Sequence, residues 1–123
     1  AEAIAAAVRR WADEDRLDLV VTTGGTGLAP RDVTPEAMDA VFEREAPGIM
    51  EAVRDHGQRR LPRAMLGRGR AGVRGRTLIV NLPGSRGAVA DALAALLPGL
   101  PHACLMLRGE GHLDDPRGGA QVS

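Results

Sequence analysis

The sequence predicts an α/β protein in which helices cover both faces of a mostly parallel sheet, a three-layer α/β/α sandwich. Two runs of aliphatic and β-branched residues, Leu17–Val21 and Thr77–Leu82, are continuous rather than alternating, which is typical of strands buried on both faces. Segments with helical periodicity lie before and after each run. Strands that alternate with helices form right-handed βαβ units, so the two strands are expected to be parallel.

The first helix is expected over Ala1–Asp13, since Ile4, Ala7, Val8 and Trp11 recur at the spacing of one helical face. The chain therefore starts inside a helix. Because two core strands do not make a stable doubly wound sheet, we expect an N-terminal βα unit, about 30 residues or more in length, to be absent from the sequence.

The next two helices are predicted from their start and stop signals. Thr34, as N-cap, and Pro35, at the first helical position, begin a helix that is expected to end near Glu45. Another helix runs from Pro47 to Gly57, where the glycine closes it.

The second half of the chain contains an Arg- and Gly-rich stretch and two further helices. Leu61–Arg76 is expected to form a short hairpin or an irregular excursion. Ser85 is the predicted N-cap of a helix over Arg86–Leu97, and a last helix covers Pro101–Arg108. Residues 1–110 are then expected to form one domain, followed by a flexible tail over residues 111–123.

The composition points away from nucleic acids and membranes as partners. Sixteen Arg, with no Lys, balance sixteen Asp and Glu, so the formal net charge is zero. Residues 1–55 carry a net charge of −6 and residues 56–123 one of +6, which suggests that one half receives a metal ion and the other an anion. Cys104 is the only cysteine, and no signal peptide or apolar run of about 20 residues is recognised, so a cytoplasmic location is expected.

Glycine-rich loops follow both predicted strands. In an open α/β sheet, ligands bind where strands pass into helices at their C-terminal ends. Glycine lets backbone amides approach an anion, and threonine hydroxyls add donors, so the loops predict a phosphate cradle. The alternative is a turn that needs glycine only for steric reasons. The candidate residues are Thr23, Gly24, Gly25, Thr26 and Gly27 after the first strand, and Pro83, Gly84 and Ser85 after the second.

Two familiar phosphate-binding motifs are excluded. A Walker A loop needs a Lys after its last Gly, and the chain contains no Lys. The dinucleotide motif G-x-G-x-x-G needs a Gly where the chain has Pro30.

Charged residues near the loops are candidates for holding a metal ion and an anion. A carboxylate beside a phosphate cradle is favourable when a divalent cation lies between them, so Asp32 is a candidate Mg²⁺ ligand. Its alternative role is to cap the turn before Thr34. The segment Arg54–Arg76 holds eight Arg and one acid, Asp55, and is either an anion-attracting rim, with Arg68 pointing inward, or a solvated surface.

Five segments together resemble the molybdopterin-binding MoaB/Mog family, which includes the molybdopterin adenylyltransferases and the G domain of gephyrin. In chain order they are "TTGGTG", "RDVTPEA", "REAPGIMEAVR", "AGVRGRTLIVNLPGS" and "LPHA", and the resemblance extends from about Leu17 to Arg108. It implies a three-layer domain that is usually trimeric. It also implies binding of molybdopterin and Mg-ATP, and adenylylation of molybdopterin with release of pyrophosphate.

The resemblance also assigns roles to residues. Thr23–Gly27 would line the nucleotide and phosphate site, Asp32 would be one of two functional aspartates, and Asn81–Ser85 would form the loop on the pterin side. The second aspartate of the family would lie upstream of Ala1. Gly67 stands where relatives commonly have Ser before an Arg, which removes a hydroxyl expected near the pterin. Two alternatives remain open, namely a molybdopterin carrier or scaffold without catalysis, and an unrelated nucleotide- or phosphate-binding domain.

Overall fold

The computed structural model describes residues 1–109, so residue 110 and the predicted tail lie outside the described residues. Eleven elements follow one another in this part of the chain, with η marking 3₁₀ helices. They are α1 (Glu2–Asp13), β1 (Leu19–Thr23), α2 (Thr34–Ala37), η1 (Met38–Ala40), β2 (Arg44–Glu45), α3 (Pro47–Gln58), η2 (Pro62–Leu66), β3 (Ala71–Arg74), β4 (Thr77–Leu82), α4 (Arg86–Leu96) and α5 (Leu100–Leu107).

The sheet has four strands in the order β1-β4-β3-β2, and it is mixed. The pairing of β1 with β4 is parallel, as expected, with Leu19 opposite Leu78 and Thr23 opposite Leu82. The β3–β4 and β2–β3 pairings are antiparallel. The prediction of a mostly parallel sheet is therefore wrong for the described residues. The physical reason is the tight turn between β3 and β4, where Gly75 has a φ of +57°, because such a turn reverses the chain direction.

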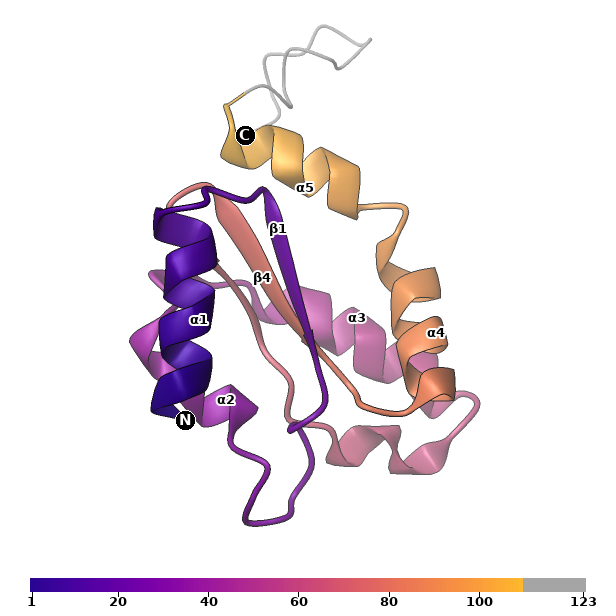
Figure 1. Ribbon diagram of the computed structural model, residues 1–123. Helices are drawn as coiled ribbons and strands as arrows, with labels where there is room; N and C mark the ends of the chain where they lie inside the picture. The colour runs from indigo at the N-terminus through magenta and orange to yellow at the C-terminus, as the bar shows by residue number, and fades with distance from the viewer. Residues whose placement is uncertain (110–123) are drawn as a thin grey trace, which may run out of the picture.

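Helices cover both faces of the sheet, as Figure 1 shows, with α1 and α2 on one side and α3 and α4 on the other. Successive side chains of β4 point to opposite faces. Leu78, Val80 and Leu82 pack in the cluster that includes α3, α4 and the start of α5. Ile79 packs in the second cluster, with α1, β1 and the α2–η1 segment. All six residues of β4 are buried, which confirms the prediction of a strand covered on both faces.

The corresponding prediction for the first strand is wrong. β1 begins at Leu19 rather than Leu17, and Val21 in its centre is 41% exposed. Within the described residues β1 lies at the edge of the sheet and pairs with β4 alone, so one flank of the strand has no cover.

The core-facing residues of α1 also differ from the expected stripe. Ala5, Val8 and Ala12 are buried, whereas Trp11 is 39% exposed. Small alanine side chains let the helix approach the sheet closely, and the large indole lies at the margin of the contact.

The helix expected from Thr34 to Glu45 is one turn long and is followed by the short η1 helix. Arg44 and Glu45 then pair with β3 as strand β2. Phe42 packs directly on Gly72 of β3, since a Cβ atom on Gly72 would lie 2.5 Å from the Phe42 ring, and this contact accompanies the change from helix to strand. Val33, not Thr34, occupies the N-cap position of α2.

The other elements follow the sequence signals closely. The helices α3, α4 and α5 are present, and Ser85 caps α4 by accepting a hydrogen bond from the Ala88 amide at 3.2 Å. The Arg- and Gly-rich excursion contains η2 and β3, and β3 forms a hairpin with β4. By length and composition no single helix within residues 1–109 could cross a membrane, although α4 and α5, bent by 62° at their junction, pass that test as a pair.

Ion pairs connect the acidic first half of the chain with the basic second half. Arg70 pairs with Glu45 at 2.6 Å and with Asp39 at 2.7 Å, and Arg74 pairs with Asp13 at 3.0 Å. Acids of the first half and arginines of the second half therefore neutralise each other around β3.

Candidate functional site

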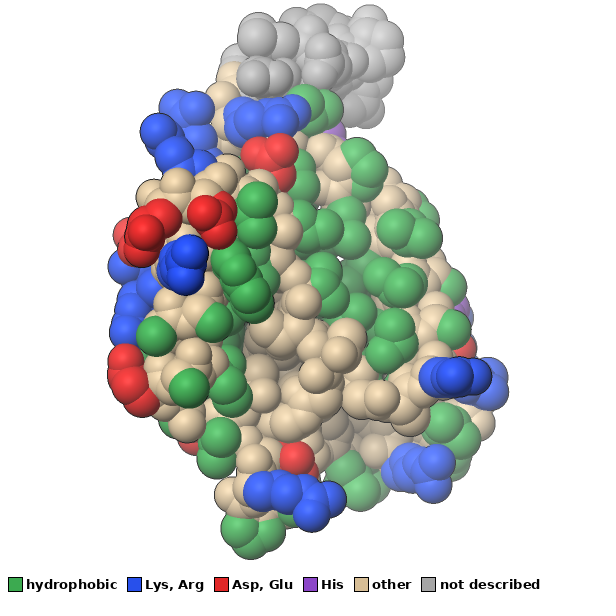
Figure 2. Space-filling view, in the orientation of Figure 1, with side chains coloured by type: hydrophobic (Ala, Val, Ile, Leu, Met, Phe, Trp, Pro, Cys, Tyr) green, Lys and Arg blue, Asp and Glu red, His purple; other side chains and the backbone are tan. Residues whose placement is uncertain are grey.

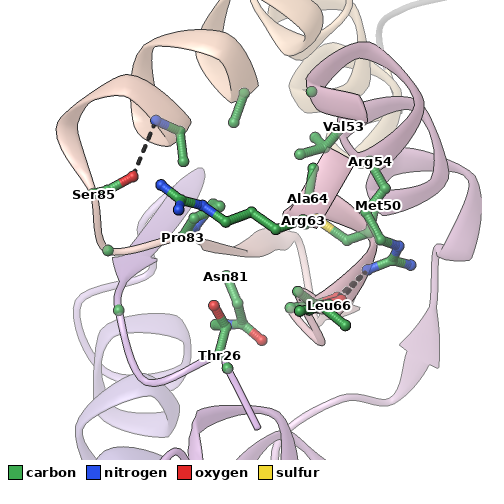
Figure 3. A pocket seen from close by; sticks show the side chains of 18 of the residues that line it. Thr26, Met50, Val53, Arg54, Arg63, Ala64, Leu66, Asn81, Pro83 and Ser85 are labelled. Atoms are coloured by element: carbon green, nitrogen blue, oxygen red, sulfur yellow. Dashed lines mark hydrogen bonds between the residues drawn. The ribbon is translucent and has the colours of Figure 1, made fainter. Parts of the chain in front are cut away.

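A cavity of about 490 Å³ opens where the parallel strands β1 and β4 end (Figure 3). Its walls come from the loop after β1, from α3, from η2, from the loop after β4 and from the first turns of α4. The sequence places the two glycine-rich loops at this edge, and the structure brings them together. The predicted site residues that line the cavity are Gly24, Gly25, Thr26, Gly27, Asp32, Asn81, Pro83, Gly84 and Ser85.

The glycine loop after β1 is a turn held by hydrogen bonds to Thr34. Gly24 and Gly25 have φ values of +87° and +69°, in the region that favours glycine. The Thr34 amide donates to the Gly25 carbonyl at 3.1 Å, and the Thr34 hydroxyl donates to the Gly24 carbonyl at 3.2 Å. A Cβ atom on Gly25 would lie 2.3 Å from the Thr34 hydroxyl oxygen. The steric explanation of these glycines therefore holds for Gly24 and Gly25.

The same loop still presents donors to the cavity. The Gly24 amide extends the sheet by donating to the Leu82 carbonyl at 3.0 Å, so it is not available to a ligand. The amides of Gly25, Thr26 and Gly27 have no acceptor within residues 1–109. The donors that the loop offers to the predicted phosphate cradle are therefore three consecutive amides.

Thr26 adds a side-chain donor to these amides. Only 6% of the residue is exposed, and it lines the cavity. Its hydroxyl has no hydrogen-bond partner in the described part of the chain. The hydroxyl oxygen is not fully buried, so it is accessible from the cavity and can form a hydrogen bond to a polar ligand atom there.

The loop after β4 packs directly on the glycine loop. A Cβ atom on Gly84 would lie 3.2 Å from the Gly24 Cα atom, so the two backbones meet without side chains between them. Pro83 and Ser85 flank this contact, and the Ser85 hydroxyl is occupied at the N-terminus of α4. Thr23, at the exposed end of β1, is not among the residues that line the cavity.

Asn81 is fully buried, and its side-chain amide group links β4 to β1 and to the residue that precedes β3. Its Oδ1 accepts a hydrogen bond from the Arg70 amide at 3.2 Å, and its Nδ2 donates to the Thr22 hydroxyl at 3.0 Å. A Cβ atom on Gly69 would lie 2.4 Å from the Asn81 carbonyl oxygen. Asn81 therefore fixes the floor of the cavity as well as lining it.

Asp32 lines the cavity next to the glycine loop. Its Oδ2 accepts a hydrogen bond from the Ala29 amide at 3.1 Å. The carboxylate therefore stabilises the turn between Ala29 and Asp32, rather than a turn between Asp32 and Thr34. Its second oxygen has no partner within residues 1–109. No group of three or more His, Cys, Asp or Glu in this range is arranged to hold a metal ion. One free carboxylate oxygen fits Mg²⁺, which proteins commonly bind through one or two carboxylates together with substrate phosphates.

Arg68, expected to point inward, does not line this cavity. Its guanidinium donates to the carbonyls of Gly27 at 2.7 Å and Asp32 at 2.6 Å, and it pairs with Glu36. These bonds hold the outer side of the loop between Gly27 and Asp32. The hydrogen bond from Arg68 also lowers the pKa of the Glu36 carboxyl below its ordinary value.

The arginines that do line the cavity are Arg54 and Arg63. Arg54 donates to the carbonyls of Gly67 at 3.3 Å and Gly69 at 3.2 Å, so its guanidinium is already engaged. Sequence reasoning placed both within the basic segment but did not single them out. The sequence offered one indication of the location of Arg63, which directly follows Pro62, a residue that starts a helical turn.

Asp91 is a second carboxylate at the cavity that sequence reasoning did not identify. It lies on α4 and pairs with Arg60 at 2.9 Å. A Cβ atom on Gly87 would lie 2.8 Å from the same guanidinium, so Gly87 makes room for this ion pair. The charge of Asp91 is therefore neutralised by Arg60 at the cavity wall.

The wall opposite the glycine loop is apolar. Its side chains come from α3, η2 and α4, and they are Met50, Val53, Leu61, Ala64, Leu66, Ala88 and Ala92. A ligand with an apolar ring system and an anionic group matches this division of the cavity into an apolar wall and a set of amide donors.

Comparison with known proteins identifies the family. Residues 1–102 match the family described as "Probable molybdopterin binding domain". The chain belongs to this family.

Solved structures of similar proteins share the fold of this molybdopterin-binding domain. The crystal structure of the molybdopterin biosynthesis enzyme MoaB from Thermus thermophilus is 54% identical, with a TM-score of 0.81 over 87% of this chain and 67% of that one. The Mog protein from Mycobacterium ulcerans is 42% identical, with a TM-score of 0.82 over 87% of this chain and 70% of that one. These structures confirm the α/β fold that the sequence predicts.

Curated relatives of the domain are molybdenum cofactor proteins that extend well beyond it. A molybdopterin adenylyltransferase of Helicobacter pylori is 42% identical over 100 residues, which is 81% of this chain and 57% of that protein. A bifunctional molybdenum cofactor biosynthesis protein of Chlorobaculum tepidum is 45% identical over 109 residues, which is 89% of this chain and 35% of that protein. The chain therefore spans between about a third and somewhat over half of the length of these relatives.

Proposed function

We propose that this domain binds molybdopterin and Mg-ATP and adenylylates molybdopterin with release of pyrophosphate. Relatives that are 42% identical carry the name molybdopterin adenylyltransferase, which supports this activity. The observation that carries the proposal is the cavity itself, in which three amides that have no acceptor within residues 1–109 and the Thr26 hydroxyl face an apolar wall.

The reaction is an in-line transfer of a nucleotidyl group. An oxygen of the terminal phosphate of molybdopterin forms a bond to the α-phosphorus of ATP, while the bond from that phosphorus to the oxygen bridging to the β-phosphate breaks. The electron pair of the broken bond leaves with pyrophosphate. Because the protein supplies little covalent chemistry in such transfers, positioning and charge stabilisation account for most of the rate.

Each part of the cavity has a role in this scheme. The amides of Gly25, Thr26 and Gly27 donate hydrogen bonds to phosphoryl oxygens as negative charge develops on them. The apolar wall packs against a ring system and excludes water from the phosphates. Asp32 would hold Mg²⁺ through its free carboxylate oxygen, and the ion would neutralise charge on the phosphates.

Adenylylation of molybdopterin by the Asp32→Asn variant tests the proposal. The amide oxygen of Asn still accepts the hydrogen bond from Ala29, so the turn is kept while the negative charge is removed. We expect turnover to fall by about 100-fold or more. The control is Asp55→Asn, which removes an exposed carboxylate that pairs with Arg59 on the surface of α3. Equal turnover in the two variants would contradict the role of Asp32.

A carrier or scaffold without catalysis is the second candidate function. It is favoured by the engagement of one oxygen of the Asp32 carboxylate in the turn at Ala29. Titration of molybdopterin together with the turnover assay separates the two functions. Tight binding without turnover would establish the carrier, whereas turnover would exclude it.

We also infer that the protein acts as a homotrimer in the cytoplasm. Figure 2 shows hydrophobic side chains gathered over α4 and α5 and along the edge of β1. Leu17, Val21, Leu97 and Met106 are each at least 41% exposed, which supports the burial of this surface by other chains. Light scattering after size exclusion, at several concentrations, tests the assembly, and a monomer at every concentration would refute it.

A further inference from the structure

Arg63 extends from η2 across the cavity toward the loop of Pro83 and Ser85 (Figure 3). The residue is exposed, and its guanidinium has no hydrogen bond or ion pair within residues 1–109. An arginine that reaches over a cavity without an acceptor of its own is positioned to meet an anion that enters the cavity.

Apart from Asp32, the other charged side chains that line the cavity already have partners. The Arg54 guanidinium donates to the carbonyls of Gly67 and Gly69. Asp91 is neutralised by Arg60 at 2.9 Å. Among the described residues that line the cavity, Arg63 is therefore the one cation whose guanidinium has no acceptor.

The surface that Arg63 faces is rich in donors. The Thr26 hydroxyl, in a residue that is only 6% exposed, has no partner within the described range, and neither do the amides of Gly25, Thr26 and Gly27. The N-terminus of α4, an 11-residue helix, opens at the same edge of the cavity. Donors on two sides, with a flexible cation above them, form a site for a group that carries several anionic oxygens.

We propose that Arg63 is a ligand-binding residue that closes over the phosphate or diphosphate group of the bound ligand. The fork of the guanidinium donates to two phosphoryl oxygens, while the glycine-loop amides hold the others. This proposal deepens the proposed function, on which it rests for the identity of the natural ligand. The binding of an inorganic anion tests it independently.

The test is calorimetric titration of the full chain with pyrophosphate, with and without Mg²⁺, for the wild type and for Arg63→Met. Methionine keeps an apolar stem that can pack on the η2 wall, so the change removes the charge with little loss of packing. We expect the dissociation constant to rise about tenfold, as for the loss of one partly solvated charge-assisted contact. Arg63→Lys keeps a charge without the fork and should weaken binding less.

Arg76→Met is the matched control. Arg76 is exposed and has no partner within residues 1–109, but it lies in the β3–β4 turn at the opposite end of β4. Six residues of strand separate that end from the cavity, which is about 20 Å and exceeds the Debye length of about 10 Å at 0.1 M salt. We expect its dissociation constant to stay within about twofold of the wild type.

The outcomes separate this proposal from the adenylyltransferase activity. Equal affinities of Arg63→Met and Arg76→Met would overturn the role of Arg63, as would a wild type that binds no pyrophosphate at millimolar concentration. A selective loss in Arg63→Met supports it, even in a protein that shows no turnover with molybdopterin and ATP. In that last case only the proposed function fails.

Discussion

The substitution Gly25→Ala tests whether the glycine loop is shaped by Thr34. Alanine at a φ of +69° costs about 1–2 kcal/mol in backbone strain. Its Cβ would also lie 2.3 Å from the Thr34 hydroxyl oxygen, which must rotate away and lose the 3.2 Å hydrogen bond to the Gly24 carbonyl. That loss adds about 0.5–1.5 kcal/mol. With the displacement of neighbouring atoms, we expect the free energy of unfolding to fall by about 2–4 kcal/mol.

Urea denaturation measures this change, and the chain offers two comparisons. Gly75→Ala carries the same type of strain at a φ of +57°, but no atom lies within 4 Å of its Cβ, so it should lose only the strain of about 1–2 kcal/mol. In a Thr34→Ala background, Gly25→Ala should likewise lose only the strain, because the clashing oxygen is gone. Equal losses for Gly25→Ala and Gly75→Ala, or no coupling between positions 25 and 34, would refute the reasoning.

Three further predictions concern the interactions that surround the cavity. The hydrogen bonds from Arg70 lower the pKa of the Glu45 carboxyl below its ordinary value of 4.5. The stability that they provide is therefore present above about pH 4.5 and is lost as the pH falls. In an acid titration, the free energy of unfolding of Arg70→Met should fall less steeply than that of the wild type. Arg68→Met should speed hydrogen exchange of the Ala29 and Asp32 amides by about tenfold, because the guanidinium no longer holds two carbonyls of the loop that these amides stabilise. Gly69→Ala should destabilise the protein to urea by about 1–3 kcal/mol, because its Cβ would lie 2.4 Å from the Asn81 carbonyl oxygen in β4.

Each of these three predictions would be contradicted by a specific result. An identical acid profile in Arg70→Met would show that the ion pair with Glu45 does not contribute to stability. Unchanged exchange in Arg68→Met would show that the Arg68 guanidinium does not stabilise the loop between Gly27 and Asp32. For Gly69→Ala the control is Gly48→Ala in α3, where no atom lies within 4 Å of the added Cβ, and equal stability of the two variants would contradict the predicted clash.

The elements that the sequence predicted well are those with local signals. The continuous apolar run of β4 and the Ser85 cap of α4 need no information from elsewhere in the chain. The short α2 and the pairing of β2 with β3 were missed because they depend on a tertiary contact, the packing of Phe42 against Gly72. Helical propensity over residues 34–45 does not reveal that contact.

The candidate site shows the same division between local and distant causes. The two glycine loops were found because each follows a strand directly, and strand ends gather ligands in such sheets. The direction of an arginine side chain, by contrast, depends on which acceptors surround it in space. Arg68 has the carbonyls of Gly27 and Asp32 and the carboxylate of Glu36 around it, whereas Arg63 has none within the described chain.

The two halves of the cavity are joined by one parallel pairing between strands that lie far apart in the sequence. Leu19 of β1 pairs with Leu78 of β4, so a long intervening segment must be closed into a loop when the two strands meet. Closing so long a segment is slow compared with forming local contacts. No fragment that lacks either strand retains the pocket, and occupancy of the pocket is therefore linked to the global folding equilibrium. A ligand present at 100 times its dissociation constant would stabilise the native state by about 2.7 kcal/mol.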